Sequence, residues 1–270
     1  MKRTRIFTFL LFAGNISFCN FSLFAQNEKI PLNHSIYEGW KTLSNAKISN
    51  NGQWVAYEIN PQQGDGYLYL VDLNGSKTDS VPRGYNPVFS NQSDFLVFKI
   101  KPQYATVRQA KKDKKKKSEM PKDTLAIWLL DGSDPLKIAD VESFKVPEDG
   151  EGWFIFQHYE KKDTAKSDTV VSDSSHVQKS KEKSRGNQIV IMDPVQNKMH
   201  LYDHVVSYDV SKKGNTFGFI QESSDTIPVC KVSFFDTEKE KLLGIFEAPG
   251  KIARIGIDEP GTRMTFLYHH

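Results

Sequence analysis

The sequence predicts an all-β protein, a β-propeller made of four-stranded antiparallel blades, and three observations lead to this expectation. First, short apolar runs separated by turns recur along the chain. Second, the composition favours strands and turns, with 18 Phe, 10 Tyr, 17 Gly and 12 Pro. Third, each recurring unit has roughly 40 residues, which is too few to fold alone without disulfides or metal. The units are therefore expected to pack on one another in series.

The N-terminal residues 1–25 have the organisation of a secretory signal peptide. Three basic residues fall within the first five positions, an apolar stretch covers 6–13, and the segment ends at Phe24-Ala25-Gln26. A membrane span would need about 20 apolar residues, and Gly14, Asn15 and Asn20 interrupt this one. Residues 16–18 before Cys19 resemble a lipidation signal poorly. We therefore expect an exported protein, periplasmic or secreted, with no stable membrane insertion and a lead-in over 26–44.

The repeat that defines the blades occupies residues 45–270. Its first part is an apolar run, a turn of the form Ser-x-x-Gly and a second apolar run, as in Ala46 to Tyr57. Its second part is an apolar run that ends in Asp, as in Tyr67 to Asp72. Further copies of the first part begin at Pro87, Ser143, Ser207 and Ala253, and the corresponding third runs end at Asp131, Asp193 and Asp236.

Each copy is interpreted as four strands. Gly in the Ser-x-x-Gly turn supplies a positive φ and the Ser side chain caps the turn, so the flanking runs pair as a hairpin. The third run follows, and an outer segment such as Pro135–Ala139 or Lys198–Tyr202 completes the blade. We count about four complete blades plus half of a fifth. This number predicts an incomplete ring, with a closed four-bladed ring as the competing geometry.

Two insertions lengthen the second and third blades, at 102–123 and 160–186. The first contains Lys111–Lys117 and the second is rich in Ser, Asp, Lys and Thr. Both lack apolar periodicity and are predicted to be charged disordered insertions. Both fall between the second and third strands of their blade, so they are expected at the rim opposite the Ser-x-x-Gly turns.

The charge distribution does not support a nucleic-acid partner. The formal net charge is +3, but nine basic residues lie within 101–122 and three more within the first five positions. The remaining chain is acidic, so no basic surface spans the predicted fold. The lysine run at 111–117 is interpreted as a solvated loop, with anionic lipid or nucleic acid as the alternative.

No catalytic, cofactor or metal site is predicted. The sequence lacks Gly-x-Ser-x-Gly, a phosphate loop and a Cys-x-x-Cys pair. His200 and His204 would chelate a metal from a helix, but on a strand they lie about 13 Å apart. His176 beside Ser174 and Ser175 belongs to a low-complexity loop. The recurrent carboxylates could form a calcium ladder, but turn capping is favoured for all of them: Asp72, Asp131, Asp193 and Asp236. After cleavage Cys230 is the remaining cysteine, so no intrachain disulfide is expected.

Several features together carry a resemblance to a known family. They are the signal peptide ending, Tyr37-Glu-Gly-Trp40, the blade turns, and the Lys-rich insertion that runs into Met120-Pro-Lys-Asp-Thr-Leu125. The chain resembles the N-terminal part of exported bacterial serine peptidases of the prolyl oligopeptidase family. The resemblance implies a seven- or eight-bladed propeller, of which this chain would form an incomplete ring. It also implies that the propeller gates or positions peptide substrates for an α/β-hydrolase domain. That catalytic domain is not found in this sequence, so the segment is not expected to be catalytic alone, and peptides would be reached through the missing domain.

An alternative function remains open at this point. The blade motifs are shared with TolB-like propellers, so the chain could be a stand-alone periplasmic propeller that binds a protein or envelope partner. The sequence has no adjacent Glu-Glu pair of the kind that dipeptidyl peptidase IV-type members use to hold a substrate amino terminus. An exopeptidase activity is therefore not predicted.

Overall fold

The computed structural model describes residues 39–75, 77–160, 186–223 and 228–269. The expected signal peptide, most of the lead-in and nearly all of the 160–186 insertion lie outside the described residues. The described elements belong to one compact unit, Trp40–His270. Within them, no helix has the length and hydropathy needed to cross a bilayer.

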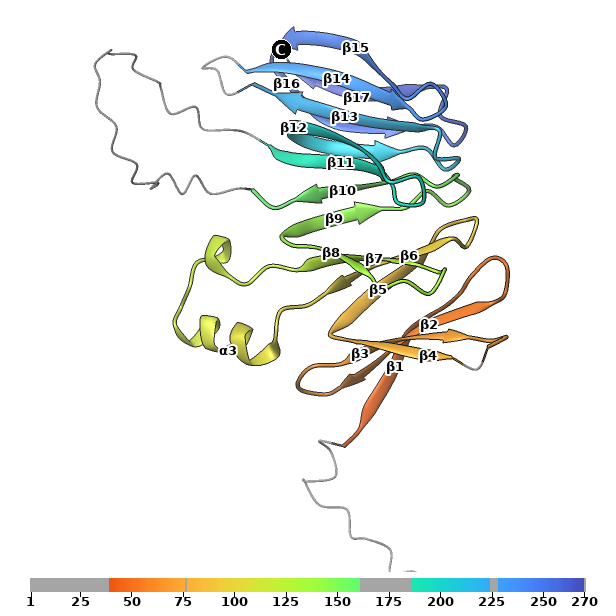
Figure 1. Ribbon diagram of the computed structural model, residues 1–270. Helices are drawn as coiled ribbons and strands as arrows, with labels where there is room; N and C mark the ends of the chain where they lie inside the picture. Colours follow the sequence, from red (N-terminus) through yellow and green to blue (C-terminus); the bar gives the residue numbers. More distant parts are fainter. Residues whose placement is uncertain (1–38, 76, 161–185, 224–227, 270) are drawn as a thin grey trace, which may run out of the picture. The chain divides into compact units, whose positions relative to one another are not determined.

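The first two blades are separate four-stranded antiparallel sheets (Figure 1). Blade 1 has the order β1-β2-β3-β4, with β1 at Lys41–Ile48, β2 at Trp54–Pro61, β3 at Tyr67–Asp72 and β4 at Thr78–Pro82. Blade 2 repeats this order with β5 at Gly84–Phe89, β6 at Phe95–Ile100, β7 at Thr124–Leu129 and β8 at Leu136–Ile138. The predicted strand order is therefore confirmed for both.

Blades 3 and 4 are joined into one seven-stranded sheet because they share a strand. Blade 3 comprises β9 at Val141–Lys145, β10 at Phe154–His158, β11 at Asn187–Asp193 and the first half of β12 at Lys198–Val210. The second half of β12 begins blade 4, which continues through β13 at Thr216–Glu222, β14 at Val229–Asp236 and β15 at Lys241–Pro249. Residues 198–202 pair with β11, residues 207–210 pair with β13, and Val205 pairs with both strands. His204 precedes Val205 and has φ at +61°, so the chain changes blade around these two residues.

A fifth unit follows as a two-stranded sheet of β16 at Lys251–Ile257 and β17 at Met264–His269. Its strands are the first and second strands of a blade by their position in the repeat. In the described part of the chain, neither strand pairs with blade 1. The expected four blades and half of a fifth are thus present, and the total number of blades in a ring stays a prediction.

Apolar side chains pack between successive blades, which explains why the central strands are apolar on both faces. In β10, Phe154 and Phe156 face blade 2 while Ile155 faces blade 4. A similar core joins blades 1 and 2 through Leu70 and Phe98, and a smaller one surrounds Ile252 of the fifth unit. Each blade buries its alternating residues against its neighbours, which stabilises the stack by the hydrophobic effect.

The predicted Ser-x-x-Gly turns are confirmed, with the hydroxyl capping the turn. Ser49 Oγ accepts the Trp54 N–H at 2.9 Å, and Ser211 Oγ accepts the Thr216 N–H at 3.2 Å. Ser90 plays the same role in blade 2, and Asp258 replaces the serine in the fifth unit. The turns also bond to those of the next blade, since the Asn51 N–H donates to Ser93 Oγ at 3.1 Å.

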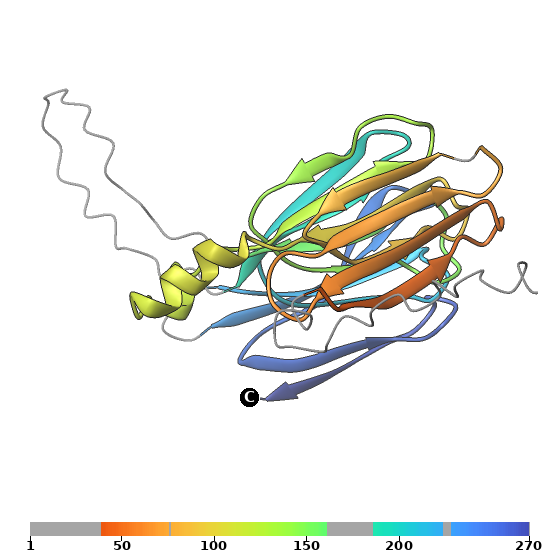
Figure 2. The ribbon, with the colours of Figure 1, turned by 90° about the horizontal axis from the view of Figure 1, so that it is seen from below.

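The 102–123 insertion differs from the disordered segment that the sequence suggested. It contains helix α3 at Tyr104–Lys112 and a 3₁₀ turn, η1, at Lys117–Glu119. The helix forms because its residues are mostly good helix formers and because one side chain, Ala110, is buried. Lys111 and Lys112 in the last turn are favoured by the helix dipole. The helix leaves blade 2 between its second and third strands, as expected, at the end opposite the turns (Figure 2).

Candidate functional site

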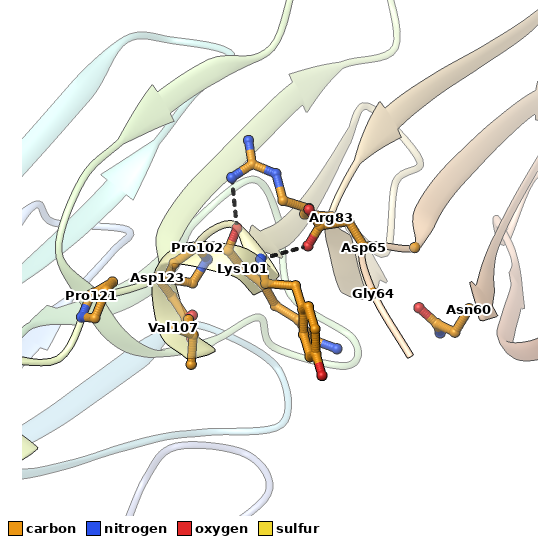
Figure 3. Close-up of a pocket in the computed structure, with 12 residues that line it drawn as sticks. Asn60, Gly64, Asp65, Arg83, Lys101, Pro102, Val107, Pro121 and Asp123 are labelled. Carbon is orange, nitrogen blue, oxygen red and sulfur yellow. Dashed lines mark hydrogen bonds between the residues drawn. The ribbon is translucent and has the colours of Figure 1, made fainter. Parts of the chain in front are cut away.

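A pocket of about 310 Å³ lies where helix α3 meets blades 1 and 2 (Figure 3). Its walls come from the β2–β3 loop, the start of β5, the segment after β6, the helix and the residues that lead into β7. The lining residues are Asn60, Gly64, Asp65, Gly66, Arg83, Gly84, Lys101, Pro102, Tyr104, Val107, Pro121 and Asp123. The pocket therefore combines charged groups with an apolar wall.

Close backbone packing forms the wall between blades 1 and 2. A Cβ atom at Gly84 would lie 2.6 Å from Leu68 Cβ, so the two blades can approach here only at a glycine. The preceding residue, Arg83, has φ at +65°, which is uncommon for a residue with a side chain. Its N–H donates to the Gly66 carbonyl at 2.7 Å, and its carbonyl accepts the Lys101 N–H at 3.0 Å. These bonds hold the Arg83 side chain at the pocket.

The helix is fixed to the pocket by its first residue. The Tyr104 N–H donates to Asp65 Oδ1 at 2.9 Å, so a carboxylate of blade 1 satisfies a free donor at the helix N-terminus. Val107 follows one turn later and adds an apolar side chain to the same wall. The Asp65 carboxylate therefore already has a hydrogen-bond donor as its partner.

A second carboxylate, Asp123, fastens the end of the insertion to blade 2. Asp123 Oδ2 accepts the Tyr85 hydroxyl at 2.6 Å and pairs with Lys99 Nζ at 2.8 Å. Lys99 also donates to the Glu142 carbonyl of blade 3 at 2.8 Å. Burial, followed by the hydrogen bond to Asp123, raises the pKa of Tyr85 well above its usual value. This cluster ties the exit of the insertion to two neighbouring blades.

A buried carboxylate, Glu58, links blades 1 and 2 behind the pocket. Its Oε1 accepts the Asn86 N–H at 2.8 Å and the Asn45 side-chain amide at 2.7 Å, and its Oε2 accepts the Asn60 side-chain amide at 3.0 Å. Asn86 lies at a bulge in β5, where the ladder to β6 is interrupted. Glu58 thus replaces a partner that the bulge removes.

The recurrent aspartates cap turns, as favoured from the sequence. Asp131 Oδ1 accepts the Ser133 N–H at 2.9 Å, and Asp193 Oδ1 accepts the Val195 N–H at 3.0 Å. The Asp236 carboxylate accepts backbone N–H groups of its turn and pairs with Lys239, which lowers the pKa of Asp236. Asp72 binds its turn in the same way. Each aspartate therefore uses its oxygens within its own blade.

Neither candidate histidine site is surrounded by a set of metal ligands among the described residues. His200 lies on β12, and its ring centroid is 4.5 Å from that of Phe235, so the partly buried ring packs against an aromatic side chain. His204 lies at the change of blade further along β12. Among the described residues, no group of three or more potential ligands gathers around a metal position. His176, Ser174 and Ser175 lie outside the described residues.

Sequence reasoning did not single out most of the pocket residues, among them Asp65, Arg83, Lys101 and Tyr104. They lie on three segments that the folded chain brings together, and no short motif contains more than two of them. Asp123 was noted only as part of the Met-Pro-Lys-Asp run. A signal was nevertheless present, because the Arg83-Gly84 pair falls at the start of a blade where no turn of the repeat requires a glycine.

Comparisons with known proteins give similarity in structure alone. No family model and no curated protein matches the sequence. Among solved structures, the acylaminoacyl peptidase of Pyrococcus horikoshii matches with 10% identity over 88% of this chain and 37% of that chain, at a TM-score of 0.44. A prolyl endopeptidase matches with 14% identity over 85% and 32%, at 0.45. The β-propeller domain of the Trilobed protease from Pyrococcus furiosus matches with 9% identity over 79% and 59%, at 0.42. The chain thus spans less than two thirds of each, and its architecture is defined here by its own strand pairing.

Proposed function

We propose that the chain is the N-terminal propeller segment of an exported serine peptidase of the prolyl oligopeptidase family, in which the blades gate or position peptide substrates. The observation that carries the proposal is the placement of the run that is most specific to the family resemblance, Met120 to Leu125. This run closes the insertion and continues directly into β7 of blade 2. Its Asp123 is bound by Lys99 and Tyr85 of the same blade.

The position of the insertion supports a role at one rim of the propeller. Helix α3 projects from the end of blade 2 that lies opposite the Ser-x-x-Gly turns (Figure 2). A rim that carries a helix and a pocket is suited to contact a peptide or a neighbouring domain, whereas the opposite rim consists of short turns bonded to one another. Binding sites commonly occur on such loops, which a rigid scaffold holds in place.

The first experiment reads the coding sequence beyond the codon for His270 and expresses the uninterrupted reading frame. We expect further blades and a Gly-x-Ser-x-Gly sequence, and labelling of that protein by a fluorophosphonate probe that is lost when the serine of the motif is changed to Ala. The 270-residue chain expressed alone is expected to show no labelling, since it contains no such motif. A stop codon followed by an unrelated gene would refute the proposal and would favour a TolB-like binding propeller.

The gating role is tested separately, in the labelled protein. Replacing residues 104–119 by a short Gly-Ser linker removes α3 and η1 while Asp123 stays in place. If the rim restricts access, the ratio of kcat/KM for a 30-residue peptide to that for a tripeptide should rise. An unchanged ratio, with both peptides still cleaved, would refute gating by this segment and would leave the family assignment standing.

A further inference from the structure

We propose that the pocket between α3 and blades 1 and 2 binds the carboxylate of a short peptide. The inference does not depend on the proposed peptidase role, because it rests on the charges and the volume of the pocket alone. A volume of about 310 Å³ lies at the lower end of the range for small-ligand sites.

The acidic groups of the pocket already have hydrogen-bond donors, and Asp123 also has a cationic partner. Asp65 accepts the Tyr104 N–H, and Asp123 is held by Lys99 and Tyr85. The Asn60 side-chain amide donates to Ser44 and Glu58. A cationic ligand would therefore have to compete with bonds that the protein has already formed.

The cationic groups of the pocket have no carboxylate partner in the described part of the chain. Arg83 donates one N–H to the Lys101 carbonyl at 3.2 Å, and no described carboxylate lies within ion-pair distance of its guanidinium. Lys101 Nζ lies 4.7 Å from the centroid of the Tyr85 ring and makes no described ion pair. A guanidinium carries five N–H donors, so Arg83 can still bind an anion. The pocket is thus charged for an anionic group.

The electrostatic field around the pocket is also positive. Six exposed lysines follow the pocket-lining part of α3 within 111–117, and none forms an ion pair with a described residue. Clustered charge of one sign raises the local concentration of an oppositely charged ligand. The lysines therefore favour the approach of an anion to this rim, although they do not line the pocket.

The remaining wall indicates that the anion is attached to an organic group. The Tyr104 side chain is 37% exposed, and Pro102, Val107 and Pro121 complete an apolar side of the pocket. A free inorganic anion would leave this surface in contact with water, whereas an amino-acid residue next to a carboxylate would cover it. The carboxylate could belong to the C-terminus of the peptide or to an acidic side chain, and the experiment distinguishes the two.

The test is calorimetric titration of the full chain at low salt with three probes: Ac-Ala-Phe-OH, its carboxamide Ac-Ala-Phe-NH₂, and Ac-Glu-Phe-NH₂. We expect the free acid to bind about tenfold or more tightly than the carboxamide, since a charge-assisted hydrogen bond is lost in the amide. Tight binding of the Glu peptide as well would assign the site to any peptide carboxylate. Weak binding of the Glu peptide would assign it to C-termini. Tight binding of the Glu peptide alone would assign it to acidic side chains. Equal affinity of the acid, the carboxamide and the Glu peptide, or no binding of either anionic probe, would overturn the proposal.

Variants distinguish binding in the pocket from general attraction by the positive charge of this rim. Arg83→Asn, with a residue that tolerates a positive φ, and Lys101→Met should each weaken the anionic probe about tenfold. The matched control is Lys112→Met, which removes the same charge from α3 outside the pocket and should change the affinity less than twofold at 150 mM salt. An equal loss in Lys112→Met and Lys101→Met would overturn the proposal, because it would show attraction by net charge alone. If Arg83→Asn fails to fold, Lys101→Met against Lys112→Met decides.

Discussion

Two glycines with the same backbone conformation should respond very differently to Ala, because only one of them is packed against another blade. Gly52 has φ at +69° and Gly214 has φ at +70°. A Cβ added to Gly52 would meet no atom within 4 Å. A Cβ added to Gly214 would lie 2.8 Å from Gly150 Cα and 2.8 Å from Pro147, both in the turn of blade 3. The pair therefore separates the cost of the left-handed conformation from the cost of the blade contact.

The two costs can be assigned separately. The left-handed conformation should cost about 1 kcal/mol at either position. At Gly214 the turns of blades 3 and 4 must also move apart, which adds an overpacking cost of about 2 kcal/mol. We expect Gly52→Ala to lower the free energy of unfolding by about 1 kcal/mol and Gly214→Ala by about 3 kcal/mol.

The assay is equilibrium urea unfolding, followed by tryptophan fluorescence and by far-ultraviolet circular dichroism. The two probes should give coincident transitions with an unchanged m-value. Equal losses at the two positions would refute the reasoning, since they would mean that the turns of blades 3 and 4 are not in contact. A smaller loss at Gly214 than at Gly52 would do so even more strongly.

Three further predictions concern the polar contacts and the insertion. Glu58→Ala should lower the free energy of unfolding by about 2 kcal/mol because the Asn86 N–H loses its acceptor, whereas Glu58→Gln should cost less than about 1 kcal/mol. Equal losses in the urea assay would show that the charge of Glu58, not its hydrogen bonding, stabilises the fold. Burial raises the pKa of Tyr208 to about 12, so the neutral phenol is favoured in the folded state. Its contribution to stability should be complete below pH 10 and fall as the pH rises from about 10 to 12. Tyr208→Phe should flatten this decline, and an unchanged dependence of the free energy of unfolding on pH would contradict the prediction. Trypsin should cut within 113–117, after the helix, before it cuts at Lys212 or Lys213 in the turn of blade 4. The reverse order by mass spectrometry would mean that the blade assignment is wrong.

The strand order of the blades could be predicted from the sequence because it depends on short-range chemistry. Apolar runs of strand length alternate with turns whose Ser and Gly residues have local roles, and Ser49 and Ser211 indeed bond within their own turns. The aspartates that end the third strands also act on the next few residues. Such features are written in consecutive residues, so the repeat reveals them.

The shared strand and the helix needed the tertiary structure. Nothing in residues 198–210 distinguishes a continuous strand from two strands, because the difference depends on how blades 3 and 4 are oriented around His204. Helix α3 was not predicted because it is short and runs into the strongly charged segment 111–117. Its first turn is held by Asp65, a residue 39 positions earlier in the chain. Long-range contacts of this kind stabilise a helix that local propensity alone leaves marginal.

The sequence by itself determined the all-β class, the antiparallel order, the turn caps and the position of the insertion, since each depends on residues close together in the chain. Only the tertiary structure decided which side chains meet at the pocket. Arg83 takes its conformation from backbone hydrogen bonds to Gly66 and Lys101. The Asp123 carboxylate at the pocket pairs with Lys99, which comes from another segment. Whether a charged side chain is paired depends on distances between segments, and these are fixed only when the blades pack.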